Sequence, residues 1–148
     1  MAPQFDSGGS PNRSFPGPQQ VAAIALGQKM DEKDKLQVFD AGAMPWEERF
    51  IPEIGKALFA KRFLEDPETG VTVRLVKYPA GFTNIWHTHP CAHGMYVLDG
   101  TLVTHQGSFG PGHFIWFPEG MTMQHGATQE RDVTVLFITN KKFEIYYR

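Results

Sequence analysis

Short segments of alternating or β-branched residues, separated by turn residues, fill the second half of the chain and restrict the folds open to it. The stretch GVTVRLVKYPAG (70–81) alternates, and GHFIWFPEG, DVTVLFIT and FEIYYR continue the pattern with Gly, Pro and Asn between them. MYVLDGTLVTH holds two apolar runs around Asp99-Gly100, a dipeptide that strongly favours a β-hairpin. This succession of short strands with little helix predicts an all-β antiparallel sandwich or barrel.

Composition divides the chain of 148 residues into three parts. Residues 1–20 are rich in Pro, Gly, Ser and Gln, which bury too little apolar surface to offset the entropy of ordering, so we expect a flexible arm. Residues 21–57 are predicted to form an N-terminal extension with a short helix over 21–26 and a helical turn over 46–50. Residues 58–148 are expected to form the barrel domain, because the strand pattern begins there.

Charge and targeting patterns exclude several classes of partner. The formal net charge is -2 at pH 7 with acidic and basic residues intermixed, so no surface is expected to attract nucleic acid or anionic lipid. The first residues lack the pattern of a secretion signal, and no apolar run reaches membrane-spanning length. The single Cys91 excludes an internal disulfide and fits a reducing compartment. We therefore expect a cytoplasmic protein that binds neither nucleic acid nor a membrane.

Histidines are concentrated in the segment NIWHTHPCAHGMYVLDG. Strand alternation places His87 and His89 on one face, so that the two imidazoles converge. Pro90 is expected to end that strand, and His93 begins the next strand, from which it can reach the same point. His125 starts a later strand. Because neutral imidazole is the commonest protein ligand for metals, the sequence predicts a metal site formed by His87, His89, His93 and His125.

Other residues near these histidines have more ordinary explanations. His105 and His113 are predicted to be surface loop residues, and Cys91 is predicted to be a loop thiol rather than a further ligand. Four apolar residues share the parity of the histidines on their strands and are candidates for the wall of a ligand pocket, although the methionines serve equally well as core residues. These predicted pocket residues are Met95, Val97, Met121 and Met123.

The spacing of the histidines resembles a motif of the cupin superfamily. That motif is a glycine, five residues, His-x-His, three or four residues, a glutamate, six residues and a glycine. Here Gly81, His87-Thr88-His89, His93 and Gly100 have these spacings, but a histidine stands in the place of the glutamate.

A second cupin motif follows in the expected order. Gly112, five residues and Pro118-Glu119-Gly120 match it, whereas four residues instead of two precede His125 and the usual later asparagine is absent. The resemblance covers roughly residues 70–145. It implies a double-stranded β-helix, the cupin jelly-roll barrel, with a metal in its mouth, and usually a homodimer. The segment HFIWF is apolar on both faces and must be covered, either by residues 21–50 or by a second subunit, and the resemblance favours the dimer.

The ligand charges suggest the chemistry of such a site. Four neutral imidazoles leave the +2 charge of a divalent metal uncompensated, which makes it a stronger Lewis acid and favours anionic bidentate ligands such as enolates. Imidazole suits several metals, so the ligands do not identify the ion: iron is our first expectation, and zinc, nickel, copper or manganese are alternatives.

By resemblance, cupins with an all-histidine site include iron enzymes that cleave β-dicarbonyl compounds with dioxygen and zinc-containing cyclases of aromatic polyketides. Our leading hypothesis is therefore a non-haem iron dioxygenase that acts on a small enolisable, β-dicarbonyl-like compound. The alternatives are a zinc-dependent polyketide cyclase or isomerase, and a non-catalytic cupin that binds a small ligand. Fold membership alone does not decide among them, because one fold supports many functions.

Overall fold

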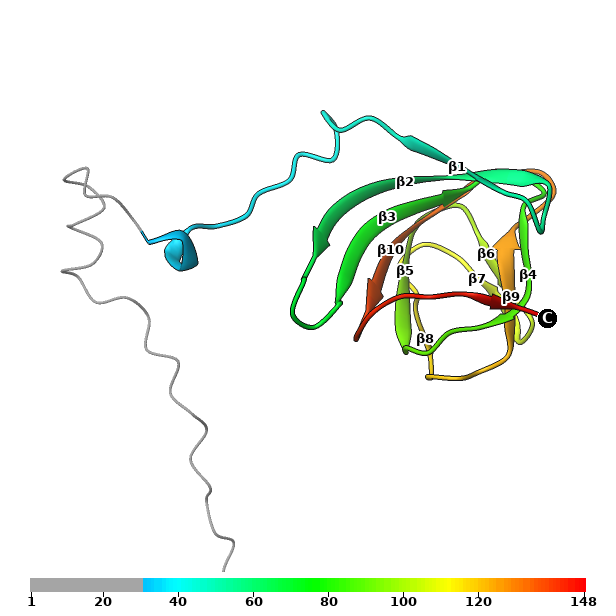
Figure 1. Cartoon of the computed structure of the whole chain (residues 1–148). Helices are drawn as coiled ribbons and strands as arrows, with labels where there is room; N and C mark the ends of the chain where they lie inside the picture. Colours follow the sequence, from blue (N-terminus) through cyan, green and yellow to red (C-terminus); the bar gives the residue numbers. More distant parts are fainter. Residues whose placement is uncertain (1–30) are drawn as a thin grey trace, which may run out of the picture. The chain divides into compact units, whose positions relative to one another are not determined.

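The computed structural model describes residues 31–148 (Figure 1). Among these residues, 31–38 belong to one unit and 39–148 to a second. The predicted arm over 1–20 and the predicted helix over 21–26 lie outside the described residues. The 3-10 turn η1 (Glu32–Asp34) lies in the described part of the first unit, residues 31–38. No helix in the described part is long and apolar enough to cross a membrane.

The second unit consists of two antiparallel sheets (Figure 1). The six-stranded sheet has the order β1 (Glu47–Ile51), β2 (Lys56–Glu65), β3 (Thr72–Tyr78), β10 (Val133–Thr139), β5 (His93–Asp99) and β8 (Phe114–Phe117). The five-stranded sheet has the order β11 (Tyr146–Tyr147), β4 (Thr83–Thr88), β9 (Met123–Ala127), β6 (Leu102–Thr104) and β7 (Gly107–Phe109). From β3 onward the chain passes repeatedly from one sheet to the other. The predicted all-β jelly roll is thereby confirmed.

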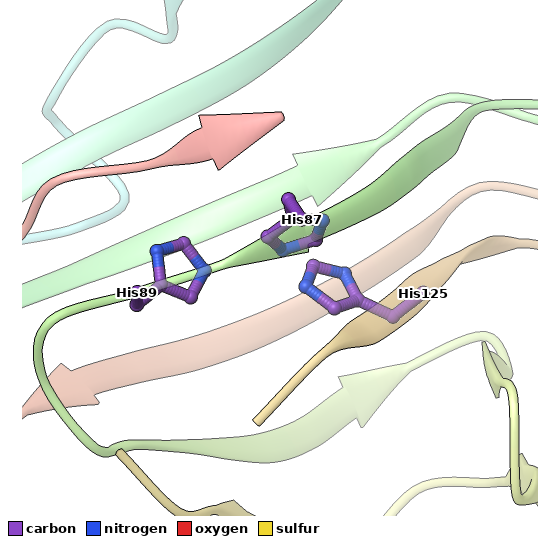
Figure 2. Close-up of side chains that lie close together, drawn as sticks. All are labelled: His87, His89 and His125. Carbon is purple, nitrogen blue, oxygen red and sulfur yellow. The ribbon is translucent and has the colours of Figure 1, made fainter. Parts of the chain in front are cut away.

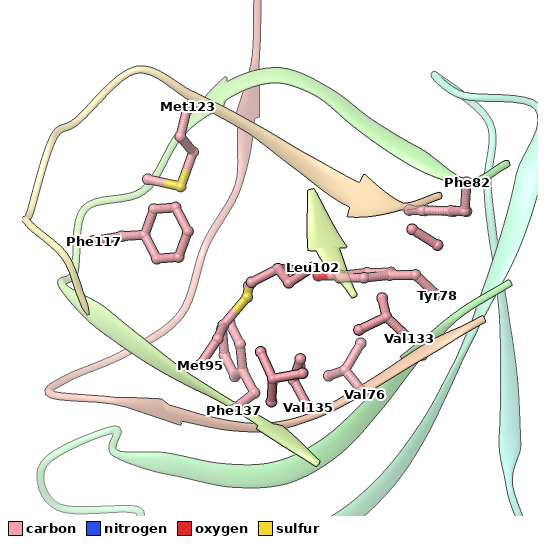
Figure 3. Packing of buried hydrophobic residues seen from close by; sticks show 12 residues of the cluster. Val76, Tyr78, Phe82, Met95, Leu102, Phe117, Met123, Val133, Val135 and Phe137 are labelled. Carbon is pink, nitrogen blue, oxygen red and sulfur yellow. The ribbon is translucent and has the colours of Figure 1, made fainter. Parts of the chain in front are cut away.

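The interior between the sheets holds the hydrophobic core (Figure 3). Strand alternation explains its composition, because β10 buries Val133, Val135 and Phe137 while the residues between them are less buried. Phe82, Leu102 and Phe117 complete the core from other strands and loops. Burial of this apolar surface supplies the main driving force for folding, and the free Cys91 forms no disulfide.

The turn at Asp99-Gly100 does not form the predicted hairpin. β5 lies in the six-stranded sheet and β6 in the five-stranded sheet, so the turn is a corner between sheets. Gly100 has a φ of 79°, and a Cβ atom there would lie 2.1 Å from the carbonyl oxygen of Asp132. Glycine is thus required for this corner, but the dipeptide alone does not distinguish a corner from a hairpin.

The predicted helical turn over 46–50 is wrong. Residues Glu47–Ile51 form β1, which pairs with β2 so that Arg49 lies opposite Leu58. The intrinsic preference of such a short segment is weak, and the backbone hydrogen bonds offered by the longer β2 outweigh it.

Exposed apolar side chains gather on β5 and β8. Tyr96, Leu98, Phe114 and Trp116 are all at least 40% exposed, and β8 is the edge strand of its sheet. A monomer rarely leaves an apolar surface of this kind on an edge strand. We propose that a second copy of the chain covers this face, as expected for a homodimer.

Charge on this face is expected to prevent dimerisation. Trp116→Glu should give a monomer at micromolar concentration in light scattering, whereas the wild type should be a dimer, because a desolvated carboxylate at the interface has no partner. The control is Phe50→Glu, which alters an exposed aromatic residue on β1, the opposite edge of the same sheet. A monomeric wild type would contradict the dimer.

Candidate metal centre

Two neighbouring strands bring three histidines together (Figure 2). His87 lies on β4, His89 follows the end of this strand, and His125 lies on β9, which pairs with β4. Each of the three residues offers a ligand atom, and these atoms all lie within 4.8 Å of one another. All three side chains are buried, so the strand alternation predicted for His87 and His89 points both rings into the interior.

Backbone carbonyls fix the orientation of two of these rings. His87 Nδ1 lies 2.5 Å from the oxygen of Ile85, and His89 Nδ1 lies 2.6 Å from the oxygen of Glu144. Since a carbonyl oxygen only accepts hydrogen bonds, Nδ1 must carry the proton in each case, which leaves a lone pair on Nε2. Metal-binding histidines in proteins are typically held by this kind of outer hydrogen bond.

Several buried nitrogens in the cluster have no hydrogen-bond partner among the described residues. They are Nε2 of His87 and both ring nitrogens of His125. A buried polar atom without a partner is costly, and a bound cation would satisfy the lone pair of His87 Nε2 and the one lone pair of the neutral His125 ring. The three histidines therefore fit a divalent metal ion of the kind that imidazole binds.

Burial keeps the imidazoles neutral. It is the main cause that lowers the pKa of His87, lowers the pKa of His89 to about 4, and lowers the pKa of His125 well below its ordinary value. Neighbouring imidazoles lower the pKa of His89 and of His125 further. At neutral pH the lone pairs are thus available to a metal without loss of a proton.

His93 lies beside the three-histidine group and is not a member of it. It begins β5 in the opposite sheet, and its ring stacks on Phe117 at a centroid distance of 4.7 Å. Its ring centroid lies 4.8 Å from that of His89 and 6.2 Å from that of His125. Neither ring nitrogen of His93 has a hydrogen-bond partner among residues 31–148, and burial lowers the pKa of this residue to about 2. Coordination of a metal by His93 stays a prediction.

The loop before β9 is tied to the histidine pair. The backbone N–H of Gly120 donates to the carbonyl oxygen of His89 at 3.0 Å. Although four residues separate Gly120 from His125, this bond fixes the turn Pro118-Glu119-Gly120 next to the centre, and His125 still reaches the group. Cys91 is buried in the loop between β4 and β5 and contributes no ligand atom to it.

A cavity of about 120 Å³ borders the histidines. His89 and His125 form part of its wall, and much of the rest is apolar or aromatic, with Phe137 and Phe143 among the residues. Several polar lining residues were not predicted, since four of them lie outside the motifs and Asn84 occupies a variable position within the first one: Arg49, Arg74, Tyr78, Asn84 and Tyr147. The one available signal was Arg74, which shares strand parity with Val76 and Tyr78 and so carries a charge on the interior face.

The four predicted pocket residues do not line this cavity. Met95 and Met123 are fully buried in the core (Figure 3). Val97 is also fully buried there, and Met121 packs against the core partly buried. Parity correctly placed their side chains on the interior side of the sheets. Parity did not indicate how deep in the barrel each side chain lies. The space beside these residues is filled by other core side chains.

Comparison with known proteins identifies the family. The model of the ChrR cupin-like domain matches residues 34–144. The chain belongs to this family. The predicted membership of the cupin superfamily is therefore confirmed. A search of curated proteins finds no match.

Solved structures share the fold of this cupin at low sequence identity. A protein of unknown function with a cupin-like fold from Ralstonia eutropha has 19% identity and a TM-score of 0.66, with 78% of this chain and 79% of the other covered. The polyketide cyclase RemF from Streptomyces resistomycificus has 15% identity and a TM-score of 0.63, with 76% and 85% covered. These likenesses show the fold alone.

Proposed function

We propose that this cupin is a metal-dependent dioxygenase, with iron as its metal, that cleaves a small enolisable β-dicarbonyl-like compound. The observation that carries the proposal is a set of three buried, neutral histidines without a carboxylate, two of which, His89 and His125, line a largely apolar cavity. A ligand set without charge favours an anionic chelating substrate, and the enolate of a β-dicarbonyl compound is such a ligand.

His87, His89 and His125 would hold the ion. When bound, iron would supply the Lewis acidity that stabilises an enolate and the electrons that activate dioxygen. The protein's part is to keep three imidazoles neutral and in place, through burial and through the carbonyls of Ile85 and Glu144.

The cavity wall contributes orientation and exclusion of water. Tyr147 donates a hydrogen bond to Asn84 Oδ1 at 3.0 Å, which fixes the amide next to the centre and leaves its N–H groups free to donate. Phe137 and Phe143 cover the wall with apolar surface, and a water-poor site strengthens the electrostatic interactions inside it.

The test is oxygen uptake by the iron-loaded full chain with pentane-2,4-dione as the probe. We expect consumption of dioxygen that matches loss of the dione, no loss of the dione under anaerobic conditions, and no uptake by His89→Ala. Conversion of the probe at an equal rate without oxygen would contradict the dioxygenase.

A second candidate is a zinc-dependent cyclase or isomerase. The same histidine set suits zinc, and the likeness to the polyketide cyclase RemF supports this alternative. Such an enzyme would turn over anaerobically in its zinc-loaded form. A non-catalytic cupin would instead bind a small ligand and release it unchanged under both conditions.

A further inference from the structure

Arg74 places a positive charge on the interior face of the six-stranded sheet. It lies on β3 between the buried residues Thr72 and Val76, which share its face. Its Nε atom is buried without a hydrogen-bond partner among the described residues, and burial lowers its pKa. The guanidinium lies over the rings of Phe137 and Phe143, with Cζ 4.6 Å from each centroid. These cation–π contacts stabilise the charge but leave its N–H donors unused.

No carboxylate among the described residues forms an ion pair with this charge, although Glu65 exerts a Coulombic attraction on it. Within residues 31–148, Arg74 forms no ion pair, and no aspartate or glutamate lines the cavity that it borders. Arg62, which lies opposite Arg74 on the neighbouring strand β2, does have a carboxylate partner: it forms a surface ion pair with Glu47 at 3.5 Å. An unpaired charge in a partly desolvated site is costly, so a missing counter-ion is the simplest explanation of this arrangement.

Two aromatic rings lie between Arg74 and two of the buried histidines, His89 and His93. The ring of Phe143 lies 4.7 Å from that of His89 and makes the cation–π contact with the guanidinium of Arg74. The ring of Phe137 lies 5.0 Å from that of His93 and also contacts the guanidinium. Arg74 and His89 both line the same cavity. A small molecule in that cavity can therefore reach both the imidazoles and the guanidinium.

We propose that Arg74 binds a carboxylate of the substrate and selects an enolisable dicarbonyl compound that carries this carboxylate at one end. The inference rests on the proposed function for the dicarbonyl part and adds the anionic group. The planar fork of the guanidinium matches a carboxylate, which fits a cavity of this size and supplies the missing counter-ion. Arg49 also lines the cavity and adds a second positive charge at its wall.

The test compares two probes that differ by one carboxylate. Calorimetric titration of the zinc-loaded full chain should show tighter binding of 2,4-dioxopentanoate than of pentane-2,4-dione. Arg74→Gln should reduce the affinity for 2,4-dioxopentanoate by roughly 10- to 100-fold, because a charge-assisted hydrogen-bonded pair is lost, and should change that for the dione little. Arg74→Lys keeps the charge without the fork and should retain part of the preference.

The matched control is Arg62→Gln, which removes an arginine beside Arg74 that does not line the cavity. It should leave the preference for 2,4-dioxopentanoate unchanged. If Arg74 had a purely structural role, Arg74→Gln would lower the affinity for both probes equally, and this result would overturn the proposal. A wild type that binds both probes with equal affinity, or that binds neither, would also overturn it. The titration and the oxygen-uptake assay can give different answers. If the preference for the carboxylate depends on Arg74 but no oxygen is consumed, this inference is supported and the proposed dioxygenase activity is contradicted.

Discussion

Replacement of His87 or His89 by alanine is expected to abolish stoichiometric metal binding while the fold is retained. Loss of an outer hydrogen-bond partner of a metal ligand already lowers metal affinity by roughly 10- to 100-fold, and loss of the ligand itself should lower it further. Each variant leaves two of the three nitrogens that lie within 4.8 Å of one another. Elemental analysis of protein purified without added metal measures the effect.

The fold should survive because the core does not depend on the metal. The apolar cluster includes Phe82, Leu102 and Val135, none of which belongs to the histidine group. His113→Ala is the control, because this exposed histidine also has Nδ1 at 2.9 Å from a backbone oxygen, that of Gly110, but lies outside the group. Full metal occupancy in both His87→Ala and His89→Ala would refute the assignment.

The histidine pair was predictable from strand geometry alone. Residues two apart in a strand share a face, so the sequence His87-Thr88-His89 already required two converging imidazoles. His125 was a candidate because it starts a later strand, but neither this position nor the inexact second motif required it to reach the pair. Its place depends on the pairing of β9 with β4, which sets it opposite Asn84, and pairing between distant strands is not encoded in local sequence.

The sheet connections were less predictable than the strands. The corner at Gly100 and the strand β1 were misjudged because local signals describe a turn or a short segment without saying what it packs against. The carbonyl of Asp132, which excludes a Cβ at Gly100, lies far along the chain. Tertiary contacts of this kind decide between alternatives that are locally equivalent.

Depth within the barrel was also hidden from the sequence. Parity placed Met95 on an interior face, and Arg74 shares an interior face with Val76, yet Met95 is part of the core and Arg74 borders the cavity. The two residues lie in one row across the sheet, each opposite Phe137 on β10. The five-stranded sheet covers one part of this row and leaves space beside another. The packing of the two sheets decides where that space lies, and the sequence pattern of a single strand does not show it.

His93→Glu is expected to give the largest change in the charge of the centre. It places a carboxylate at the position where the related motif has one, beside His89. Metal should bind at least as tightly as in the wild type, because one negative ligand offsets part of the +2 charge. The Lewis acidity of the ion should fall, and anionic chelators should bind more weakly.

The size of this effect follows from the repulsion between the new carboxylate and the bound dionate, which both carry a negative charge. Two unit charges about 4 Å apart interact by about 4 kcal/mol at an effective dielectric constant of 20. A fraction of this energy is enough to weaken the binding of pentane-2,4-dionate by roughly 10- to 100-fold. Titration of the metal-loaded protein with the dione across pH measures it. His93→Gln serves as the control, since it removes the imidazole without adding charge. If the curves of the wild type and His93→Glu coincide at every pH, His93 lies outside the metal's influence and only His87, His89 and His125 form the centre.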